Sequence, residues 1–129
     1  MSNAIQIDSI ATFTADEFNI TKFIDLMNKP EISNNQFTPI WPGTPEYDET
    51  TYFAWWFLHN IWNYNPEKNV IHFSFGNGRS AHTNRDFNAL LSFLGKQFAI
   101  RPIVFSVDLR DEYDGFKTTY YERKTIKPN

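Results

Sequence analysis

The stretch that decides the fold is Val70-Ile71-His72-Phe73-Ser74-Phe75-Gly76-Asn77-Gly78. Its first six residues are mostly apolar and rich in β-branched and aromatic side chains, so they predict a strand over 70–75, which the two glycines end. A helix start follows, because Thr83 can cap it and an apolar stripe runs from Phe87 to Phe98. Gly95 lies inside this stripe and is expected to end the helix early.

Two further strands are expected after this helix. Residues 103–109 read Ile-Val-Phe-Ser-Val-Asp-Leu, which is typical of a strand. An acidic turn at 110–116, which contains Gly115, then reverses the chain into residues 116–125. The pattern predicts a C-terminal β-hairpin.

The N-terminal region is predicted to hold a strand and a helix. Residues 4–10 begin with alternating apolar and polar side chains, as in a short strand. Thr14-Ala15-Asp16-Glu17 reads as a capping box, and Phe13 and Phe18 occupy the positions of a hydrophobic staple. A helix is therefore expected to start at this box and to end before Pro30.

The central part of the chain combines a long loop with an aromatic block. Residues 31–50 contain three prolines and Gly43, which predicts a loop. The residues from Tyr52 to Tyr64 are dominated by aromatic side chains and suit either a helix or a strand. Their length, their acidic lead-in and the Asn-Pro pair that follows favour a helix over 51–64.

These elements together predict an α+β fold formed by one domain, residues 1–129. The sheet is expected to be small, mixed or antiparallel, with about four strands and a C-terminal hairpin. Two or three helices are expected to pack mainly on one face. The aromatic content of 18% predicts a core rich in rings.

Composition excludes several functional classes. The chain has no cysteine, so a disulfide framework and thiol chemistry are excluded, and no signal segment or membrane-spanning run is recognised. We expect a cytoplasmic protein, in the host cytoplasm if a phage encodes it, that binds no cofactor and does not enter a membrane.

Charge is distributed unevenly along the chain. The formal net charge is -3, but residues 31–67 carry five acidic residues and no lysine or arginine. The remainder is therefore about +2, and its C-terminal part groups Arg123, Lys124 and Lys127. Nucleic acid is thus not the expected partner, since the central segment would repel phosphates.

The favoured functional interpretation is a non-enzymatic binding protein that inhibits or occludes a macromolecular partner, of the phage-inhibitor or toxin-immunity type. Small size, the lack of a catalytic motif and an acidic aromatic segment motivate it. Tyrosine and tryptophan give large, stiff contact surfaces, and neighbouring carboxylates suit a protein partner with a basic surface. The predicted contact residues are Trp41, Glu46, Tyr47, Asp48, Glu49 and Tyr52. Homodimerisation through the aromatic block is compatible with this interpretation.

The alternative interpretation is a protein that binds a nucleotide or a phosphorylated metabolite. Free amides at a glycine-rich loop before a helix attract anions, and the loop adds side-chain donors. No established nucleotide-binding motif is present, because both the Walker spacing and the three-glycine dinucleotide pattern are missing. The residues concerned are Gly76, Asn77, Gly78, Arg79, Ser80 and His82.

Enzymatic and metal-binding functions have weaker support. His72-Phe73-Ser74 has the tripeptide form of two-histidine phosphoesterases, but no second tripeptide of this form occurs. The histidines at 59, 72 and 82 lack paired ligand spacing. The acidic residues around 108–114 fail the calcium-loop pattern and are interpreted as a solvated turn. An enzyme that acts through His72 or His82, for example on a phosphodiester, is the third interpretation.

Overall fold

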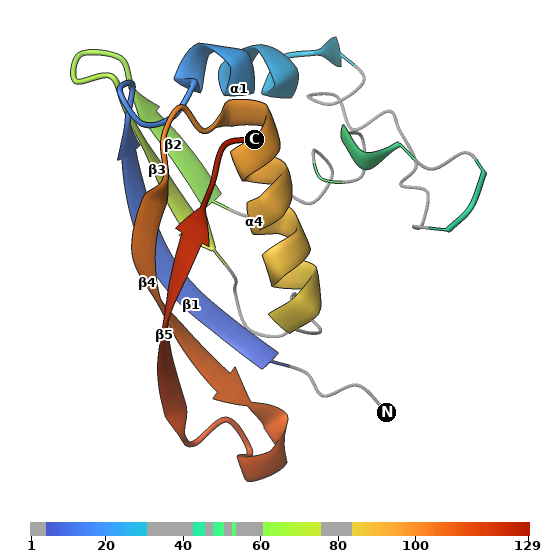
Figure 1. The fold of residues 1–129 in the computed structure, drawn as a ribbon. Coiled ribbons are helices and arrows are strands. Elements are labelled where there is room, and N and C mark those ends of the chain that lie inside the picture. Colours follow the sequence, from blue (N-terminus) through green and yellow to red (C-terminus); the bar gives the residue numbers. More distant parts are fainter. Residues whose placement is uncertain (1–4, 31–42, 46–47, 51–52, 54–60, 76–83) are drawn as a thin grey trace.

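A computed structural model describes residues 5–30, 43–45, 48–50, 53, 61–75 and 84–129. The regular elements whose bounds fall within these residues are five strands, two α-helices and one short 3-10 helix, η2 (Figure 1). In chain order they are β1 (Ile5–Thr14), α1 (Ile20–Met27), β2 (Ile61–Asn65), β3 (Val70–Phe75), α4 (Asn84–Phe98), β4 (Ile103–Asp111), η2 (Glu112–Asp114) and β5 (Thr119–Ile126).

The five strands form one antiparallel sheet in the order β2-β3-β1-β4-β5. The elements β1, α1, β2, β3, α4 and β4 succeed one another as strand, helix, strand, strand, helix and strand. This succession and the strand order β4-β1-β3-β2 correspond to the split β-α-β arrangement of ferredoxin-like folds, which β5 extends at one edge. The predicted α+β class is confirmed, with five strands in place of about four.

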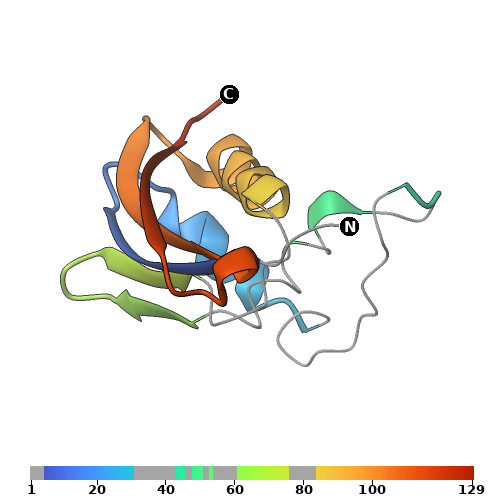
Figure 2. The ribbon, with the colours of Figure 1, turned by 90° about the horizontal axis from the view of Figure 1, so that it is seen from below.

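Both helices cover the same face of the sheet (Figures 1 and 2). Strand β1 shows why, because Ile7, Ala11 and Phe13 are buried while the alternate residues Asp8 and Ile10 are exposed. Successive side chains of a strand point to opposite faces. The buried set therefore faces the helices, and the other face of β1 is left to solvent.

The core between sheet and helices is built mainly from phenylalanine. The ring of Phe73 on β3 lies between 5.2 and 5.9 Å from the rings of four other phenylalanines. These partners come from β1, the β1–α1 turn, α1 and β3; they are Phe13, Phe18, Phe23 and Phe75. The expected ring-rich core is confirmed, and such tilted or offset pairs add to area burial.

The predicted start of the first helix is wrong. Strand β1 continues to Thr14, where it still pairs with β3, and α1 begins only at Ile20 with Asn19 as its N-cap. The Thr14 hydroxyl donates to a Glu17 carboxylate oxygen at 3.1 Å, so the presumed capping box closes a turn. The staple pair does form, because the rings of Phe13 and Phe18 lie 5.5 Å apart.

The predicted helix over 51–64 is wrong at its C-terminal end. Residues Ile61–Asn65 form β2, an edge strand paired with β3. Trp62 and Tyr64 are half-buried and pack against the core, while Asn63 between them is exposed. The strand preference of aromatic residues prevails here because β3 offers a ladder of backbone partners. Phe53 is helical, whereas 51–52 and 54–60 lie outside the described residues.

Helix α4 does not end at Gly95 but continues to Phe98. A Cβ atom at position 95 would overlap the backbone carbonyl of Lys127. This glycine therefore permits close contact between the helix and the end of β5, and its effect on helix propensity is secondary.

The C-terminal hairpin prediction is confirmed. Strands β4 and β5 pair from Ile103↔Ile126 to Arg110↔Thr119. Between them η2 is followed by its C-cap Gly115, which adopts φ 69°, and then by Phe116 with φ 64°. The left-handed conformation suits glycine, and it turns the chain back into β5.

Candidate functional site

The predicted acidic contact surface is described only in part. Asp48 is exposed and Glu49 is half-buried, whereas Trp41, Glu46, Tyr47 and Tyr52 lie outside the described residues. The Asp48 carboxylate accepts a hydrogen bond from the Thr50 amide at 3.1 Å. Asp48 thus caps the helical turn that begins at Glu49, a structural role that leaves its carboxylate at the surface.

Phe53 anchors this segment to helix α4. Its buried ring stacks on Phe93 of α4 with centroids 4.9 Å apart. Thr50 lines a cleft between α1 and α4 together with Lys22 and Phe93. Thr50, the last residue of the acidic segment 31–50, therefore lies on the helix-covered side of the sheet.

The predicted anion-binding loop lies outside the described residues. This holds for all six of its residues, Gly76, Asn77, Gly78, Arg79, Ser80 and His82. The loop joins β3 to α4, which begins at Asn84, directly after the predicted cap Thr83. Anion binding by this loop therefore stays a prediction.

His72 on β3 is the histidine that the structure describes, since residues 59 and 82 fall in undescribed segments. It is exposed, and its Nδ1 lies 2.7 Å from the Thr12 hydroxyl across the β1–β3 ladder. Asn63 of β2 is its partner on the other side. The hydroxyl of a neighbouring strand thus supplies the ring with a hydrogen-bond partner. No group of three or more potential metal ligands occurs within the described ranges.

The β4–β5 hairpin carries the most exposed tyrosines that the structure describes. Tyr113 and Tyr121 are each 76% exposed, and Tyr120 is 52% exposed. Figure 1 shows the hairpin extending beyond the lower end of α4, with η2 at its tip. We call these three tyrosines, with the carboxylates of residues 108–114, the hairpin surface. Large aromatic side chains in such a position are characteristic of contact sites.

Carboxylates lie close to these tyrosines in the sequence. Residues 108–117 contain four acidic and two basic residues, a net charge of -2. In the strand register Tyr121 pairs with Asp108, and Asp108 in turn pairs with Asp8 of β1. Tyr121 therefore lies beside two aligned carboxylates on the uncovered face of the sheet, where like charges opposite each other are destabilising. A basic partner group would offset this repulsion.

The tip of the hairpin is ordered by its own carboxylates. Asp111 accepts from the Tyr113 amide at 2.9 Å, and Asp114 accepts from the amides of Lys117 and Thr118 at 3.1 Å each. A hydrogen bond from the Thr118 side chain, with these backbone bonds, lowers the pKa of Asp114. The prediction of an acidic turn is confirmed, and these acids hold Tyr113 on a defined backbone.

Sequence reasoning missed the hairpin surface as a contact site. Three tyrosines within nine residues, next to an acidic turn, were a visible signal. A strand residue is exposed only if its strand is at an edge or its face is uncovered, and the sequence does not state either condition. The strand order supplies the first condition, and the position of both helices on one face supplies the second.

Comparison of the chain with protein-family models, curated proteins and solved structures finds no match. Among the described helices, none is both long enough and apolar enough to cross a membrane. Functional inference therefore depends on the geometry of this chain alone.

Proposed function

We propose that this chain is a non-enzymatic binding protein that occludes a protein partner with a basic surface. The observation that carries the proposal is that a projecting acidic hairpin exposes three tyrosines, with Tyr120 and Tyr121 on opposite faces of β5 and Tyr113 in η2. Aromatic residues supply a large contact area at low cost in side-chain entropy, and the surrounding carboxylates select a cationic partner.

The edge position of β5 supports the same proposal. Within the described sheet, β5 has β4 as its neighbour on one side only. Its outward backbone groups can therefore pair with an extended segment of a partner, while Tyr121 contributes side-chain contacts next to that ladder. Charged residues at Glu122 and Arg123 would oppose indiscriminate pairing with other strands.

The acidic segment 31–50 is the second part of the proposed contact surface. It shares the chemistry of the hairpin surface, since each sequence combines tyrosine with nearby carboxylates and segment 31–50 adds Trp41. Occlusion of a partner's functional surface, as in phage inhibitors or immunity proteins, requires such broad contacts and no catalytic group.

The experiment is reconstitution of a complex from purified components. The chain is used to capture proteins from a lysate of its source organism, and a recovered partner is purified and titrated by calorimetry. We expect a stoichiometric complex in which the partner's own activity is lost. Tyr121→Ala and Tyr113→Ala should each weaken binding at least about tenfold if these residues are hot spots.

Ile100→Ala is the matched control, because Ile100 is 55% exposed and follows α4, outside the hairpin surface. It should leave affinity unchanged. A tyrosine variant that binds as well as the parent chain would refute the hairpin surface. A double variant Asp48→Ala, Glu49→Ala tests the acidic segment separately, so loss there with intact tyrosine variants would assign the contact to residues 31–50.

A further inference from the structure

Strand β2 forms an edge of the described sheet and carries no charged side chain. It pairs with β3 on one side, and on the other side no described segment hydrogen-bonds to its backbone. The outward backbone groups of such a strand are a template for pairing with another chain. Its sequence is Ile-Trp-Asn-Tyr-Asn, so no charge on the strand opposes this pairing.

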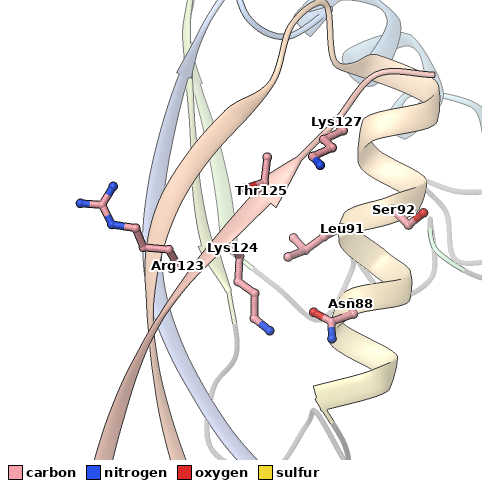
Figure 3. A pocket seen from close by; sticks show the side chains of 7 residues that line it. All are labelled: Asn88, Leu91, Ser92, Arg123, Lys124, Thr125 and Lys127. Atoms are coloured by element: carbon pink, nitrogen blue, oxygen red, sulfur yellow. The ribbon is translucent and has the colours of Figure 1, made fainter.

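The opposite edge, β5, shows the usual protection. It contains Glu122, Arg123 and Lys124 in succession. Figure 3, a view of the cleft between α4 and the end of β5, shows Arg123 and Lys124 leaving the strand in opposite directions. Charges on both faces of an edge strand hinder unspecific pairing. Strand β2 is therefore the less protected edge.

A small groove lies between β2 and helix α1. Its volume is about 110 Å³, and it is lined by Ile20, Thr21, Ile24 and Asp25 of α1 and by Tyr64 of β2. Sites for small molecules usually measure about 300–1,000 Å³, whereas a cavity of about 150 Å³ accommodates benzene. The groove therefore has room for one aliphatic side chain and is too small for a drug-sized ligand.

Packing between β2 and α1 holds this groove in shape. The rings of Trp62 on β2 and Phe23 on α1 meet edge to face, with centroids 5.4 Å apart. The Tyr64 hydroxyl donates to the side-chain oxygen of Asn69 at 2.9 Å, which orients the tyrosine ring. Ile20 is buried and supplies an apolar floor. The groove is thus preformed, which lowers the entropic cost of binding.

Asp25 gives the groove a negative rim. Its side chain is exposed, and it forms no ion pair with another described residue. Lys22, one turn earlier on α1, donates instead to the Gln97 carbonyl oxygen at 2.9 Å. A cationic side chain of a partner can therefore pair with Asp25.

We propose that the edge of β2 and this groove bind an extended peptide segment of a partner protein. The segment pairs with β2 as an additional strand and inserts one aliphatic side chain between Ile24 and Tyr64. Residues two apart on a strand point to the same face, so a lysine or arginine two positions from this aliphatic residue reaches Asp25. The site lies at the opposite edge from β5 and goes beyond the proposed function, which it does not require.

A peptide segment fits this edge better than a second copy of the chain does. Stable interfaces between proteins bury at least about 1,200 Å². Strand β2 has five residues and a length of about 17 Å, which is too short to supply that area. A twofold dimer through β2 would also bring two Asp25 carboxylates to one interface, where like charges oppose association.

The test is a titration of the ¹⁵N-labelled full chain with a synthetic peptide, followed by NMR. The probe is Thr-Lys-Thr-Val-Thr-Lys-Thr, whose threonines favour an extended chain and whose lysines suit either strand direction. We expect saturable shifts of the amides in 20–25 and 61–65. Serine in place of the valine should weaken binding at least about tenfold, because the groove loses its apolar occupant.

Backbone pairing is tested with N-methylated forms of the same peptide. Alternate amides of a strand point to opposite sides, so only one set can face β2. Methylation of that set should abolish binding, and methylation of the other set should leave it intact. Equal binding of the two methylated peptides would contradict strand addition.

Variants of the chain test the groove and its rim. Thr21→Trp fills the groove from an exposed position and should weaken binding at least about tenfold. Ala89→Trp is the matched control, because Ala89 is exposed on α4 and does not line the groove. Asp25→Asn should weaken binding about two- to fivefold, and only for peptides that carry the lysines.

Three outcomes would overturn the proposal. They are shifts without saturation, unchanged affinity in a folded Thr21→Trp variant, and a dimer of the free chain that Thr21→Trp dissociates in sedimentation experiments. The last result would assign the β2 edge to a second copy. None of these results bears on the hairpin surface, whose tyrosine variants should bind the peptide as the parent chain does.

Discussion

Gly95 of α4 lies directly against the backbone carbonyl of Lys127, at the point where β5 ends. Gly95→Ala should therefore destabilise the protein by about 1–3 kcal/mol, although alanine favours helix, because the new methyl group must displace the C-terminal backbone. Urea unfolding followed by circular dichroism measures the change. Ser92→Ala, at an exposed position of the same helix, should change stability by less than about 0.5 kcal/mol. A Gly95→Ala variant as stable as the parent would contradict the close contact.

The ring of Phe73 contacts four other phenylalanine rings of the core, so its removal should lower the stability of the protein strongly. Phe73→Ala should lower the free energy of unfolding by about 3–5 kcal/mol, because a fully buried ring is replaced by a cavity among phenylalanines. Chemical denaturation at equilibrium provides the value. Val104→Ala, an exposed position of β4, serves as the control and should cost less than about 0.5 kcal/mol. A loss below about 1 kcal/mol at Phe73 would show that the core is packed differently.

Asn19 caps helix α1 by accepting a hydrogen bond from the Lys22 amide at 3.1 Å. Asn19→Ala should destabilise the protein by about 1 kcal/mol, whereas Asn19→Ser should retain most of the stability. Hydrogen exchange of the first amides of α1 should accelerate in the alanine variant alone. If Thr14→Ala accelerated those amides and Asn19→Ala did not, the helix would start at the capping box after all.

Asp114 makes the hairpin tip sensitive to acid. Its pKa in the folded protein lies below the ordinary value, mainly because of the hydrogen bond from the Thr118 side chain. A depressed folded pKa means that the stabilisation is present above the unfolded pKa and is lost as the pH falls through the folded pKa. The hairpin turn should therefore loosen only in strong acid.

Carbon-13 NMR of the Asp114 carboxyl group measures this pKa directly. Thr118→Val removes the hydroxyl but keeps the backbone amide, so the pKa of Asp114 should rise toward the ordinary value without reaching it. An unchanged titration in Thr118→Val would show that backbone hydrogen bonds alone lower the pKa of Asp114.

Local sequence patterns predicted most of the elements. The composition of 70–75 and 103–109 and the apolar stripe of 87–98 identified β3, β4 and α4 because their periodicity is set by burial on one face. The boundary between β1 and α1 was placed five residues early, since Thr14 and Glu17 have the form of a cap but belong to a turn. The residue types at Thr14 and Glu17 allow the hydrogen bonds of a capping box. Because β1 continues to pair with β3 up to Thr14, these two residues form a turn instead.

The candidate sites were less accessible to sequence reasoning. Tyr121 and Lys124 are three residues apart, yet one lies on the uncovered face and the other faces helix α4. Alternation along β5 separates them, but only the strand order shows that β5 is an edge, and only the packing of Gly95 on Lys127 shows that α4 borders its end. Residues 76–83 and 31–42 lie outside the described residues. The anion-binding loop and the contact residue Trp41 therefore stay predictions from the sequence.

The sequence by itself determined the α+β class, the ring-rich core and the terminal hairpin, because these depend on short-range patterns of apolar side chains and turn residues. Only the tertiary structure decided that residues 61–65 become an edge strand, that Gly95 is a contact point, and that Lys124 and Lys127 line a cleft beside α4. These features join segments far apart in the chain. Their energies come from backbone pairing and close packing between elements, which no local pattern encodes.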